Sequence, residues 1–451
     1  MTPTTFIIFG ITGDLAQRKL LPSLLNLYVK KVLTKKFAIV GFSRRAFSRE
    51  DFRQYVRDHI NIRPGQYKEE DVKHFLDHLY YEQGMFDEPS SYASLAARLQ
   101  ILDDGFTQCS HKLFHLAVAP SFYETILKHL SNSGLTIPCG GNEGWTRVLV
   151  EKPFGHTIET ARNLDKELGE LFDESQIFRI DHYLAKEALQ NIMAFRFSNA
   201  LFEPLWNHEH IEAVHIKLLE KNGIEGRGGF YDDIGALKDV GQNHILQMLA
   251  LVAMEPPKVF DADNIRKERA KLLARLKPFS GKKAGDAITR GQYEGYANET
   301  GVKRNSRTET YFRLETYIDS PRWKNVPFYL ESGKALAENK SEISIYFKSD
   351  TEEQNILTFR IQPDEGIKIK FFVKTPGFDM KVEPKTLKFK YSDTIEDIPD
   401  AYERVLYDAI MGDQTLFTST DEVMEAWKFI TSVVMNWGTV PLMVYKKGSS
   451  I

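Results

Sequence analysis

The sequence predicts two domains, an amino-terminal α/β domain with a parallel sheet and a carboxy-terminal α+β domain with helices and a large mixed, mostly antiparallel sheet. Short apolar runs that end in polar turns recur through the first 180 residues, as in parallel sheets. Beyond residue 300, apolar and polar side chains alternate with a period of two. A chain of 451 residues also exceeds what one core usually organises. We expect the domains to span residues 1–180 and 181–451.

The composition describes an ordinary globular protein. A net charge of -3, from 59 basic and 62 acidic side chains, gives no general attraction to nucleic acid or to anionic membranes. Cys109 and Cys139 are too few for a disulfide framework, and neither has the spacing of a metal site. The first residues lack a basic region followed by an apolar core, and no run approaches the roughly 18 apolar residues of a membrane span. We therefore expect a soluble cytoplasmic protein without a metal.

The amino terminus reads as strand, glycine turn and helix. Residues 6–9 form an apolar run, Gly10 and Gly13 follow, and leucines recur with helical spacing from residue 20 to 27. Glycine at the first position permits a tight turn, and glycine at the second lets the backbone approach a pyrophosphate. Two glycines alone also fit a plain turn at the start of a helix, because the usual third glycine is replaced by Ala16. Together with the strands that follow, the pattern predicts a Rossmann-type dinucleotide-binding domain.

The second strand, residues 37–40, indicates which dinucleotide is bound. It ends at Gly41-Phe42-Ser43-Arg44-Arg45, with no acidic residue to hold the ribose hydroxyls. Arginine at this place accommodates a 2′-phosphate. The sequence therefore predicts NADP as the cofactor, with NAD as a possible alternative in the same site. The alternative is a solvated basic loop.

Two further strands end in turns that carry polar residues. Residues 112–116 include His115, which we expect to be packed within its strand. Residues 147–150 are followed by Glu151-Lys152-Pro153, and an X-Pro bond can be cis, which would hold Lys152 in an unusual direction. The alternative for Lys152 is an exposed lysine at a strand end. Residues 51–60 and 92–99 are predicted helices.

A carboxylate, an imidazole, a phenol and an ammonium gather in residues 179–187, Arg-Ile-Asp-His-Tyr-Leu-Ala-Lys-Glu. The apolar residues that follow recur with helical spacing, so the cluster is predicted to lie at a helix N-terminus. That end of a helix favours anions, and a lysine in its first turn, Lys186, is unfavourable unless an anion is bound. The alternative is a capping aspartate with solvated neighbours.

The second half combines a long helix with alternating strands. Residues 234–254 are predicted to be helical, and His244 lies on an apolar stripe where a packed core histidine is the ordinary alternative. His208 and His210 have no third ligand with clear spacing, so no metal site is predicted. Residues 279–291 and 294–306 are expected to be mobile loops. Strands are expected at residues 213–220, 311–318, 343–347, 356–361, 367–371 and 387–391.

These motifs together resemble the glucose-6-phosphate dehydrogenase family. The resemblance rests on the glycine turn with Asp14, Leu15 and Lys19, on Glu151-Lys152-Pro153, on residues 179–187 and on Asp239-Val240-Gly241-Gln242-Asn243-His244. The chain departs from the family at Ala185, usually glycine, where we expect the methyl group to be tolerated within a helix. Glu331 and Ser344 replace arginines that bind a second, structural NADP in some members, so we expect no such second site.

The resemblance implies oxidation of glucose 6-phosphate at C1 to 6-phosphoglucono-1,5-lactone, with NADP as the acceptor. It implies that His244 is the general base and that Asp181 supports it. The implied substrate-binding residues are Lys152, His182, Tyr183, Lys186, Glu220, Asp239, Lys334 and Gln362. The implied cofactor-binding residues are Gly10, Ile11, Thr12, Gly13, Asp14, Leu15, Lys19, Arg44 and Lys152. A homodimer or tetramer is also implied, with the carboxy-terminal domain forming the subunit contacts.

Two other functions stay open on the sequence alone. A related nicotinamide oxidoreductase could act on an unphosphorylated sugar. A non-catalytic NADP-sensing protein could keep the nucleotide fold without needing a base, although the retained Asp181 and His244 argue against it.

Overall fold

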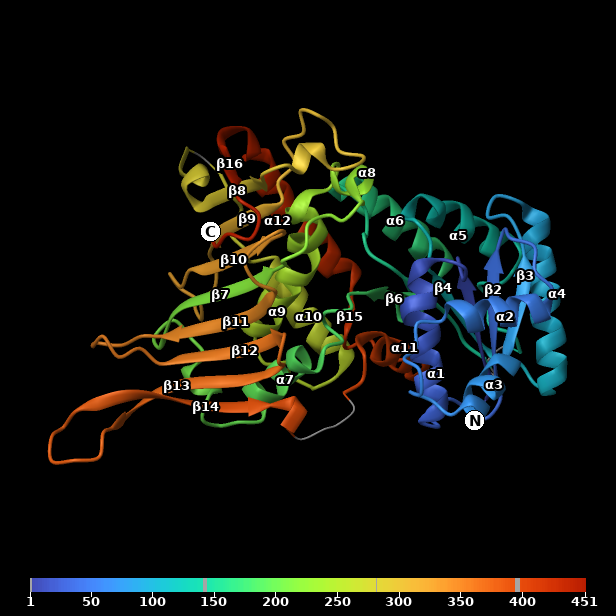
Figure 1. Ribbon diagram of the computed structural model, residues 1–451, viewed down its shortest axis with the longest axis horizontal. Helices are drawn as coiled ribbons and strands as arrows, with labels where there is room; N and C mark the ends of the chain where they lie inside the picture. The colour runs from blue at the N-terminus through green and yellow to red at the C-terminus, as the bar shows by residue number, and fades with distance from the viewer. Residues whose placement is uncertain (1, 141–143, 281, 394–397) are drawn as a thin grey trace. The chain divides into compact units, whose positions relative to one another are not determined.

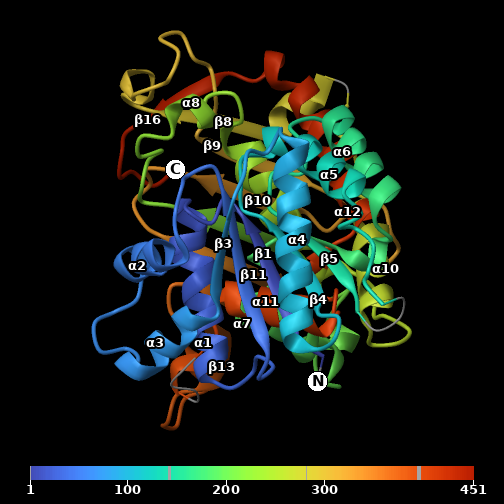
Figure 2. The same ribbon diagram turned by 90° about the vertical axis from the view of Figure 1, so that its right-hand side faces the viewer.

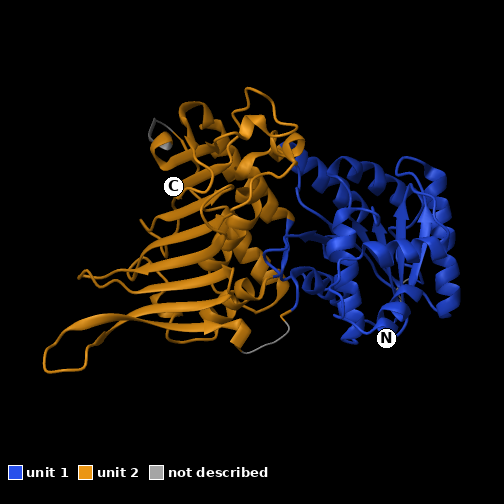
Figure 3. Cartoon of the chain, viewed as in Figure 1, with its two compact units in different colours: residues 1–155, 159–185, 399–419 blue, residues 156–158, 186–398, 420–451 orange. Residues whose placement is uncertain are grey.

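The computed structural model describes residues 2–140, 144–280, 282–393 and 398–451. Met1 of the amino-terminal stretch and residue 281 of the expected loop 279–291 lie outside the described residues. The chain forms two compact units (Figure 3). The first unit comprises Met1–Gly155, Glu159–Ala185 and Pro399–Ser419, and the second comprises His156–Ile158, Lys186–Ile398 and Thr420–Ile451.

A seven-stranded sheet forms the centre of the first unit. Its strands are β1 (Thr4–Phe9), β2 (Phe37–Ser43), β3 (Leu79–Gln83), β4 (His111–Leu116), β5 (Thr146–Val150), β6 (Ile177–Ile180) and β15 (Phe417–Thr418). The order is β3-β2-β1-β4-β5-β6-β15, and every pair is parallel except β6 with β15. The first six strands thus have the Rossmann order, which confirms the predicted fold. β1 and β2 are buried throughout, which explains their continuous apolar runs.

Helices flank this sheet, and Figure 1 shows α1 and α4 on opposite sides of it. They are α1 (Leu21–Val29), α2 (Arg49–His59), α3 (Glu69–Asp77), α4 (Pro89–Phe106), α5 (Tyr123–Asn132), α6 (Ile158–Leu171) and α11 (Ala401–Met411). A π-helical turn, Ala16–Leu20, precedes α1. Ser48 caps α2, because its hydroxyl accepts a hydrogen bond from the backbone N–H of Asp51. Figure 2, turned by 90° from Figure 1, shows α4 running along the sheet on the side that faces the viewer.

The first unit also contains residues 399–419, a late segment of the chain. The expected domain boundary at residue 180 had assigned this segment to the second domain. In this segment α11 packs against α1, and β15 extends the sheet with Phe417 opposite Ile180. The Gln414 amide donates hydrogen bonds to the carbonyls of Glu174 (2.8 Å) and Ile177 (2.9 Å). Backbone pairing and a buried amide therefore hold residues 399–419 in the first unit.

The second unit is built on a nine-stranded sheet. Its strands are β7 (Ile211–Leu219), β8 (Ile288–Tyr293), β9 (Tyr311–Thr316), β10 (Phe328–Gly333), β11 (Lys340–Phe347), β12 (Ile356–Gln362), β13 (Gly366–Lys374), β14 (Val382–Lys390) and β16 (Leu442–Tyr445). The order is β14-β13-β12-β11-β7-β10-β9-β8-β16. Only the pairs β7 with β10 and β8 with β16 are parallel among these described strands. The predicted mixed, mostly antiparallel sheet is confirmed.

Helices cover one face of this second sheet, as Figure 1 shows for α7, α9, α10 and α12. The helices of the unit are α7 (Glu187–Phe197), α8 (Gly228–Tyr231), a π-helix (Leu237–Ile245), α9 (Leu246–Ala253), α10 (Ala262–Leu273) and α12 (Thr420–Met435). A fully buried ion pair, Arg269 Nε to Glu422 Oε1 at 2.7 Å, joins α10 to α12. None of the helices in the described ranges is long and apolar enough to cross a membrane.

One local expectation was wrong, and one confirmed helix has an unexpected form. Residues 288–291 are not loop but the start of β8, which pairs with β9 and β16, so partners distant in sequence decide their conformation. The segment 234–254 is helical as predicted, but it is a π-helix over Leu237–Ile245 and becomes α-helical only from Leu246. Both segments belong to the second unit, and the π-helix carries two of the predicted site residues.

Candidate functional site

A pocket of about 590 Å³ lies at the carboxyl ends of β1 to β4, where Rossmann domains bind dinucleotides. Gly10, Thr12, Gly13 and Arg44 line it, as the sequence predicted. Gly10 has a φ of +79°, and a Cβ there would lie 2.5 Å from the carbonyl oxygen of Ala117. Because only glycine fits this turn, no side chain fills the pocket beside the backbone at this position. The residues present therefore suit a dinucleotide.

The remaining predicted cofactor residues of the glycine turn do not line this pocket. The Ile11 side chain is buried, and its carbonyl accepts a hydrogen bond from Gln17. Asp14 pairs with Arg18 at 2.7 Å on the surface. The Lys19 ammonium lies 3.0 Å from Asp400, at the start of α11. Leu15 and Lys152 are likewise absent from the pocket lining.

Most of the pocket wall consists of residues that no sequence motif indicated. The lining also includes Ser43, Gly84, Met85, Phe86, Asp87, Ala117, Val118, Ala119, Ser121, Phe122 and Thr125. Residues 84–87 follow β3, which the sequence did not indicate as a strand. For the lining residues from Ala117 to Thr125, the turn expected after residues 112–116 was the one signal in the sequence. Thr12 and Ser43 connect the first two strand ends through their hydroxyls at 3.2 Å.

A buried hydrogen-bond network surrounds the residue before Lys152. The Glu151 carboxylate lies 3.0 Å from His115 Nε2 and accepts a hydrogen bond from the Tyr402 hydroxyl at 3.3 Å. Tyr123 donates to the Glu151 carbonyl at 3.0 Å. Burial, followed by the Glu151 charge, raises the pKa of Tyr402, so its hydroxyl stays a donor. The bond between Lys152 and Pro153 is cis, which the sequence allowed, and His115 is packed in its strand, as expected.

The segment 181–186 forms turns before α7. Asp181 is buried, and its Oδ1 accepts the backbone N–H of Tyr183 at 3.0 Å, so it stabilises this turn and does not cap α7. The His182 ring stacks at 6.3 Å on the ring of Tyr402, from the late segment. Tyr402 therefore supports two motifs, although no sequence pattern marked it.

The helix after this motif begins one residue later than the prediction required. Lys186 is the N-cap of α7, with extended backbone angles, and does not lie in its first turn. Ala185 lies in the preceding turn and is not helical, but it is not among the residues with positive φ, so its methyl group causes no strain. Burial raises the pKa of Glu365, whereas the Lys186 charge and a hydrogen bond from the Ala188 N–H lower it. The Glu365 carboxylate thus lies at this helix end.

Three predicted substrate-binding residues meet in the second unit. Lys334, whose side chain is 5% exposed, forms an ion pair with Glu220, and its Nζ lies 3.8 Å from Asp239 Oδ2. The ring of Tyr231 lies 5.5 Å from the same ammonium. Two carboxylates facing one ammonium provide acceptors and donors suited to hydroxyl groups.

The π-helix determines how Asp239 and His244 are spaced. Five residues correspond to about 1.4 turns of an α-helix, which would place the two residues on different faces. In a π-helix the hydrogen bonds run from i to i+5, so the two residues are one turn apart. His244 is 3% exposed, and its backbone N–H donates to the Asn243 side chain at 2.6 Å.

The carboxy-terminal residues hold the turn that presents Lys334. The Tyr445 hydroxyl donates to the Lys334 carbonyl at 2.7 Å, and Gly448 N–H donates to the Ala335 carbonyl at 2.8 Å. Ala335 has a φ of 54°, a strained value for a residue with a Cβ. Gln362, by contrast, is exposed at the end of β12, before a cis proline.

Two family models together match nearly the whole chain. Residues 7–191 match the model of the glucose-6-phosphate dehydrogenase NAD binding domain, and residues 193–450 match that of the glucose-6-phosphate dehydrogenase C-terminal domain. The chain belongs to the glucose-6-phosphate dehydrogenase family. The family model of the first domain supports a nicotinamide dinucleotide as cofactor.

Individual relatives in the family align over nearly their full length. Glucose-6-phosphate 1-dehydrogenase of Chlamydia pneumoniae is 41% identical, over 96% of this chain and 90% of the relative. That of Bacillus subtilis is 38% identical, over 96% and 91%. A solved glucose-6-phosphate dehydrogenase in complex with its substrate glucose-6-phosphate has a TM-score of 0.92 and 34% identity, covering 99% of this chain and 95% of that one. A 3-ketoreductase from Actinomadura kijaniata, at 10% identity and a TM-score of 0.54, shares the fold alone.

Proposed function

We propose that this chain oxidises D-glucose 6-phosphate at C1 to 6-phospho-D-glucono-1,5-lactone, the first step of the oxidative pentose phosphate pathway, with hydride transfer to NADP. The observation that carries the proposal is the cluster of Glu220, Lys334 and Asp239 in a chain that matches both domains of the family. The carboxylates would accept hydrogen bonds from sugar hydroxyls, and the ammonium would donate one. Lys152 and Gln362 complete the proposed sugar contacts.

His244 is the proposed general base. An imidazole titrates near neutral pH, so it can accept the proton of the C1 hydroxyl as the carbonyl forms. Asp181 is the carboxylate assigned to support the imidazolium that results. The role of NADP, when it is bound, is to accept the hydride.

His182, Tyr183 and Lys186 are the residues proposed to bind the substrate phosphate. Side chains, and not the first N–H groups of α7, would make most of these contacts, because the Ala188 N–H already donates to Glu365. The effect of the Lys186 charge on Glu365 supports the placement of this ammonium at the helix start. A dianionic phosphate there would pair with cationic donors, which form the strongest hydrogen bonds.

The preference for NADP over NAD is proposed from Arg44. This arginine lines the nucleotide pocket at the end of β2, where NAD-selective domains place an acid. Arg44→Ala should raise KM for NADP about tenfold or more while changing KM for NAD little, since a charge-assisted contact contributes about 1.5–3 kcal/mol. Equal effects on both cofactors would refute this role for Arg44.

We further propose that the protein is a cytoplasmic homodimer or tetramer, and that the nine-stranded sheet of the second unit forms the contact between subunits. On the face away from the helices, His215 lies between the rings of Tyr329 (4.6 Å) and Tyr346 (4.8 Å). Burial, followed by the charges of Lys217 and Arg313, lowers the pKa of His215 to about 4. A face that carries aromatic rings around an uncharged imidazole suits a second copy. Sedimentation at several protein concentrations tests the assembly, and a monomer throughout would refute it.

The activity itself is tested by following NADPH or NADH absorbance with glucose 6-phosphate or glucose, each with NADP or NAD. The proposal expects the highest kcat/KM with glucose 6-phosphate and NADP. Equal rates with glucose, together with an unchanged KM in Lys186→Ala, would favour an oxidoreductase for unphosphorylated sugars. No turnover in all four mixtures, with NADP still bound, would indicate a non-catalytic nucleotide-binding protein.

A further inference from the structure

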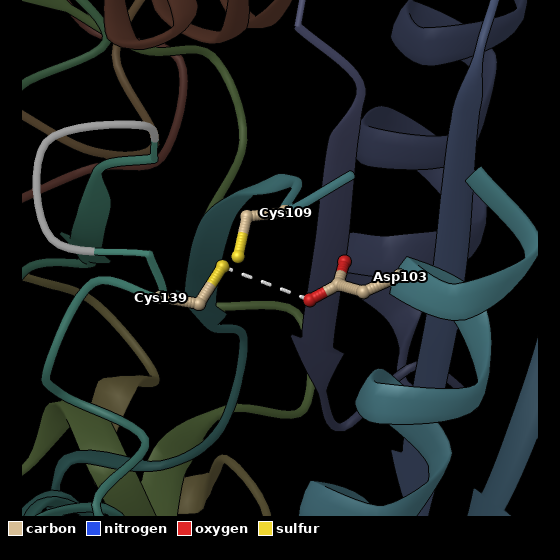
Figure 4. Close-up of side chains that lie close together, drawn as sticks. All are labelled: Asp103, Cys109 and Cys139. Atoms are coloured by element: carbon tan, nitrogen blue, oxygen red, sulfur yellow. Dashed lines mark hydrogen bonds between the residues drawn. The ribbon is translucent and has the colours of Figure 1, made fainter. Parts of the chain in front are cut away.

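The two cysteines of the chain, which are far apart in sequence, meet in the first unit. Cys109 precedes β4, and Cys139 follows α5, and both are partly buried. Figure 4 shows their Sγ atoms pointing toward each other, with the Asp103 carboxylate beside them. One carboxylate oxygen of Asp103 and the two sulfurs all lie within 4.8 Å of one another. Sequence spacing gave no indication of this proximity.

A hydrogen-bonded lysine fixes the surroundings of the pair. Lys112 Nζ donates to both carboxylate oxygens of Asp103, at 2.9 and 2.7 Å, and to the Ser110 carbonyl at 3.0 Å. The Cys139 Sγ lies 3.7 Å from Asp103 Oδ2 and 3.9 Å from the Lys112 ammonium. Asp103 is thus already paired, and the ammonium would repel a metal cation. The geometry favours chemistry between the two sulfurs over metal binding.

We propose that Cys109 and Cys139 form a reversible intramolecular disulfide by exchange with a small-molecule disulfide such as oxidised glutathione. The Cys109 thiolate attacks one glutathione sulfur, so that a mixed disulfide forms and one glutathione leaves. The Cys139 sulfur then attacks Cys109 Sγ, and the second glutathione leaves. Two protein thiols are oxidised by two electrons, one glutathione disulfide is reduced, and the two thiol protons end on the two glutathione molecules.

The environment of Cys139 sets the order of these steps. Burial, followed by a hydrogen bond with Cys109, raises the pKa of the Cys139 thiol to about 12, although the Lys112 charge opposes the rise. A thiol that stays protonated attacks slowly, so Cys139 acts second. Closure of the ring should therefore be the slower step at neutral pH.

The disulfide would enclose β4 and α5 in one covalent loop. The segment between them and the first turn of α5, including Ala117, Phe122 and Thr125, line the nucleotide pocket at the far end of β4 from Cys109. A cross-link removes conformational freedom from the unfolded chain. We expect oxidation to raise Tm by about 2–8 °C and to leave turnover within about twofold, because the cross-link lies at the amino end of β4 and the pocket at its carboxyl end.

The experiment uses the full chain treated with oxidised glutathione at neutral pH, then alkylated and digested. The proposal expects a peptide pair linked through Cys109 and Cys139, no alkylation at either residue, and complete reversal by a thiol reductant. Cys139→Ser should stop at a glutathione adduct on Cys109, whereas the matched Cys109→Ser should form an adduct more than about tenfold more slowly.

Three results would overturn the proposal. Both thiols could remain alkylated in full after oxidation, or separate glutathione adducts could accumulate on both without a linked peptide. Retention of one equivalent of Zn²⁺ after gel filtration, with protection of both thiols, would instead identify a metal site. The two single variants keep the test meaningful even if one of them is poorly folded.

Discussion

Lys334 offers the sharpest test of the proposed sugar site. Lys334→Met keeps most of the side-chain volume but removes the ammonium that faces Glu220 and Asp239. A hydrogen bond from a charged group contributes about 1.5–3 kcal/mol. At about 1.36 kcal/mol for each factor of ten, kcat/KM for glucose 6-phosphate should fall about 10- to 150-fold. KM for NADP should stay the same, because Lys334 does not line the nucleotide pocket.

The same substitution should also lower stability modestly. Removing one partner of a fully buried ion pair costs about 3–5 kcal/mol, but the Glu220 side chain is 38% exposed and Asp239 19%, so solvent screens the remaining repulsion. We expect a loss of about 1 kcal/mol and a fall in Tm of about 2–4 °C. Differential scanning fluorimetry measures this change alongside the kinetics.

Lys340→Met is the matched control. Lys340 lies in β11 of the same sheet and pairs with Glu342 at 3.0 Å and Glu338 at 3.6 Å. Its loss should change Tm by a similar or smaller amount, because these pairs are only partly buried, and should leave kcat/KM within about twofold, because Lys340 is not among the proposed site residues. The same kcat/KM in both variants would contradict a role for Lys334 in binding the sugar. A raised KM for NADP in Lys334→Met would contradict it as well.

Three further outcomes are expected. His244→Asn should lower kcat about 10²- to 10⁴-fold while NADP still binds, and an active variant in steady-state assays would exclude this base. Tyr445→Phe removes a hydrogen bond to the Lys334 carbonyl. It should raise KM for glucose 6-phosphate about 2- to 10-fold with little change in kcat. A fall in Tm without a change in KM would mean that the contact is only structural. Asp232→Asn should destabilise the protein most above about pH 4 and progressively less below it. Burial opposes ionisation of Asp232, but hydrogen bonds from Ser306 and other donors outweigh it and lower the pKa. The stabilisation by the ionised carboxylate is therefore lost as pH falls through the folded pKa. Urea unfolding at several pH values measures it, and a difference from wild type that is constant with pH would contradict the explanation.

Local patterns in the sequence were sufficient for the two folds and for several site segments. The apolar run before Gly10, its tight turn and the following helix predicted the Rossmann unit, because strand and helix periodicities follow from backbone geometry within a few residues. The alternation in residues 311–318 and 367–371 likewise predicted strands of the second sheet. The roles of Asp181 and His244 came from the family resemblance and remain predictions.

Only the tertiary structure decided which distant residues meet. Residues 399–419 return to the first unit and bring Tyr402 to Glu151 and His182, a contact that depends on pairing between strands far apart in sequence. The same is true of Tyr445 at the Lys334 turn, and of Cys109 beside Cys139. Spacing along the chain fixes the local conformation, whereas side-chain proximity across the fold depends on how complete elements pack, which no short sequence window contains.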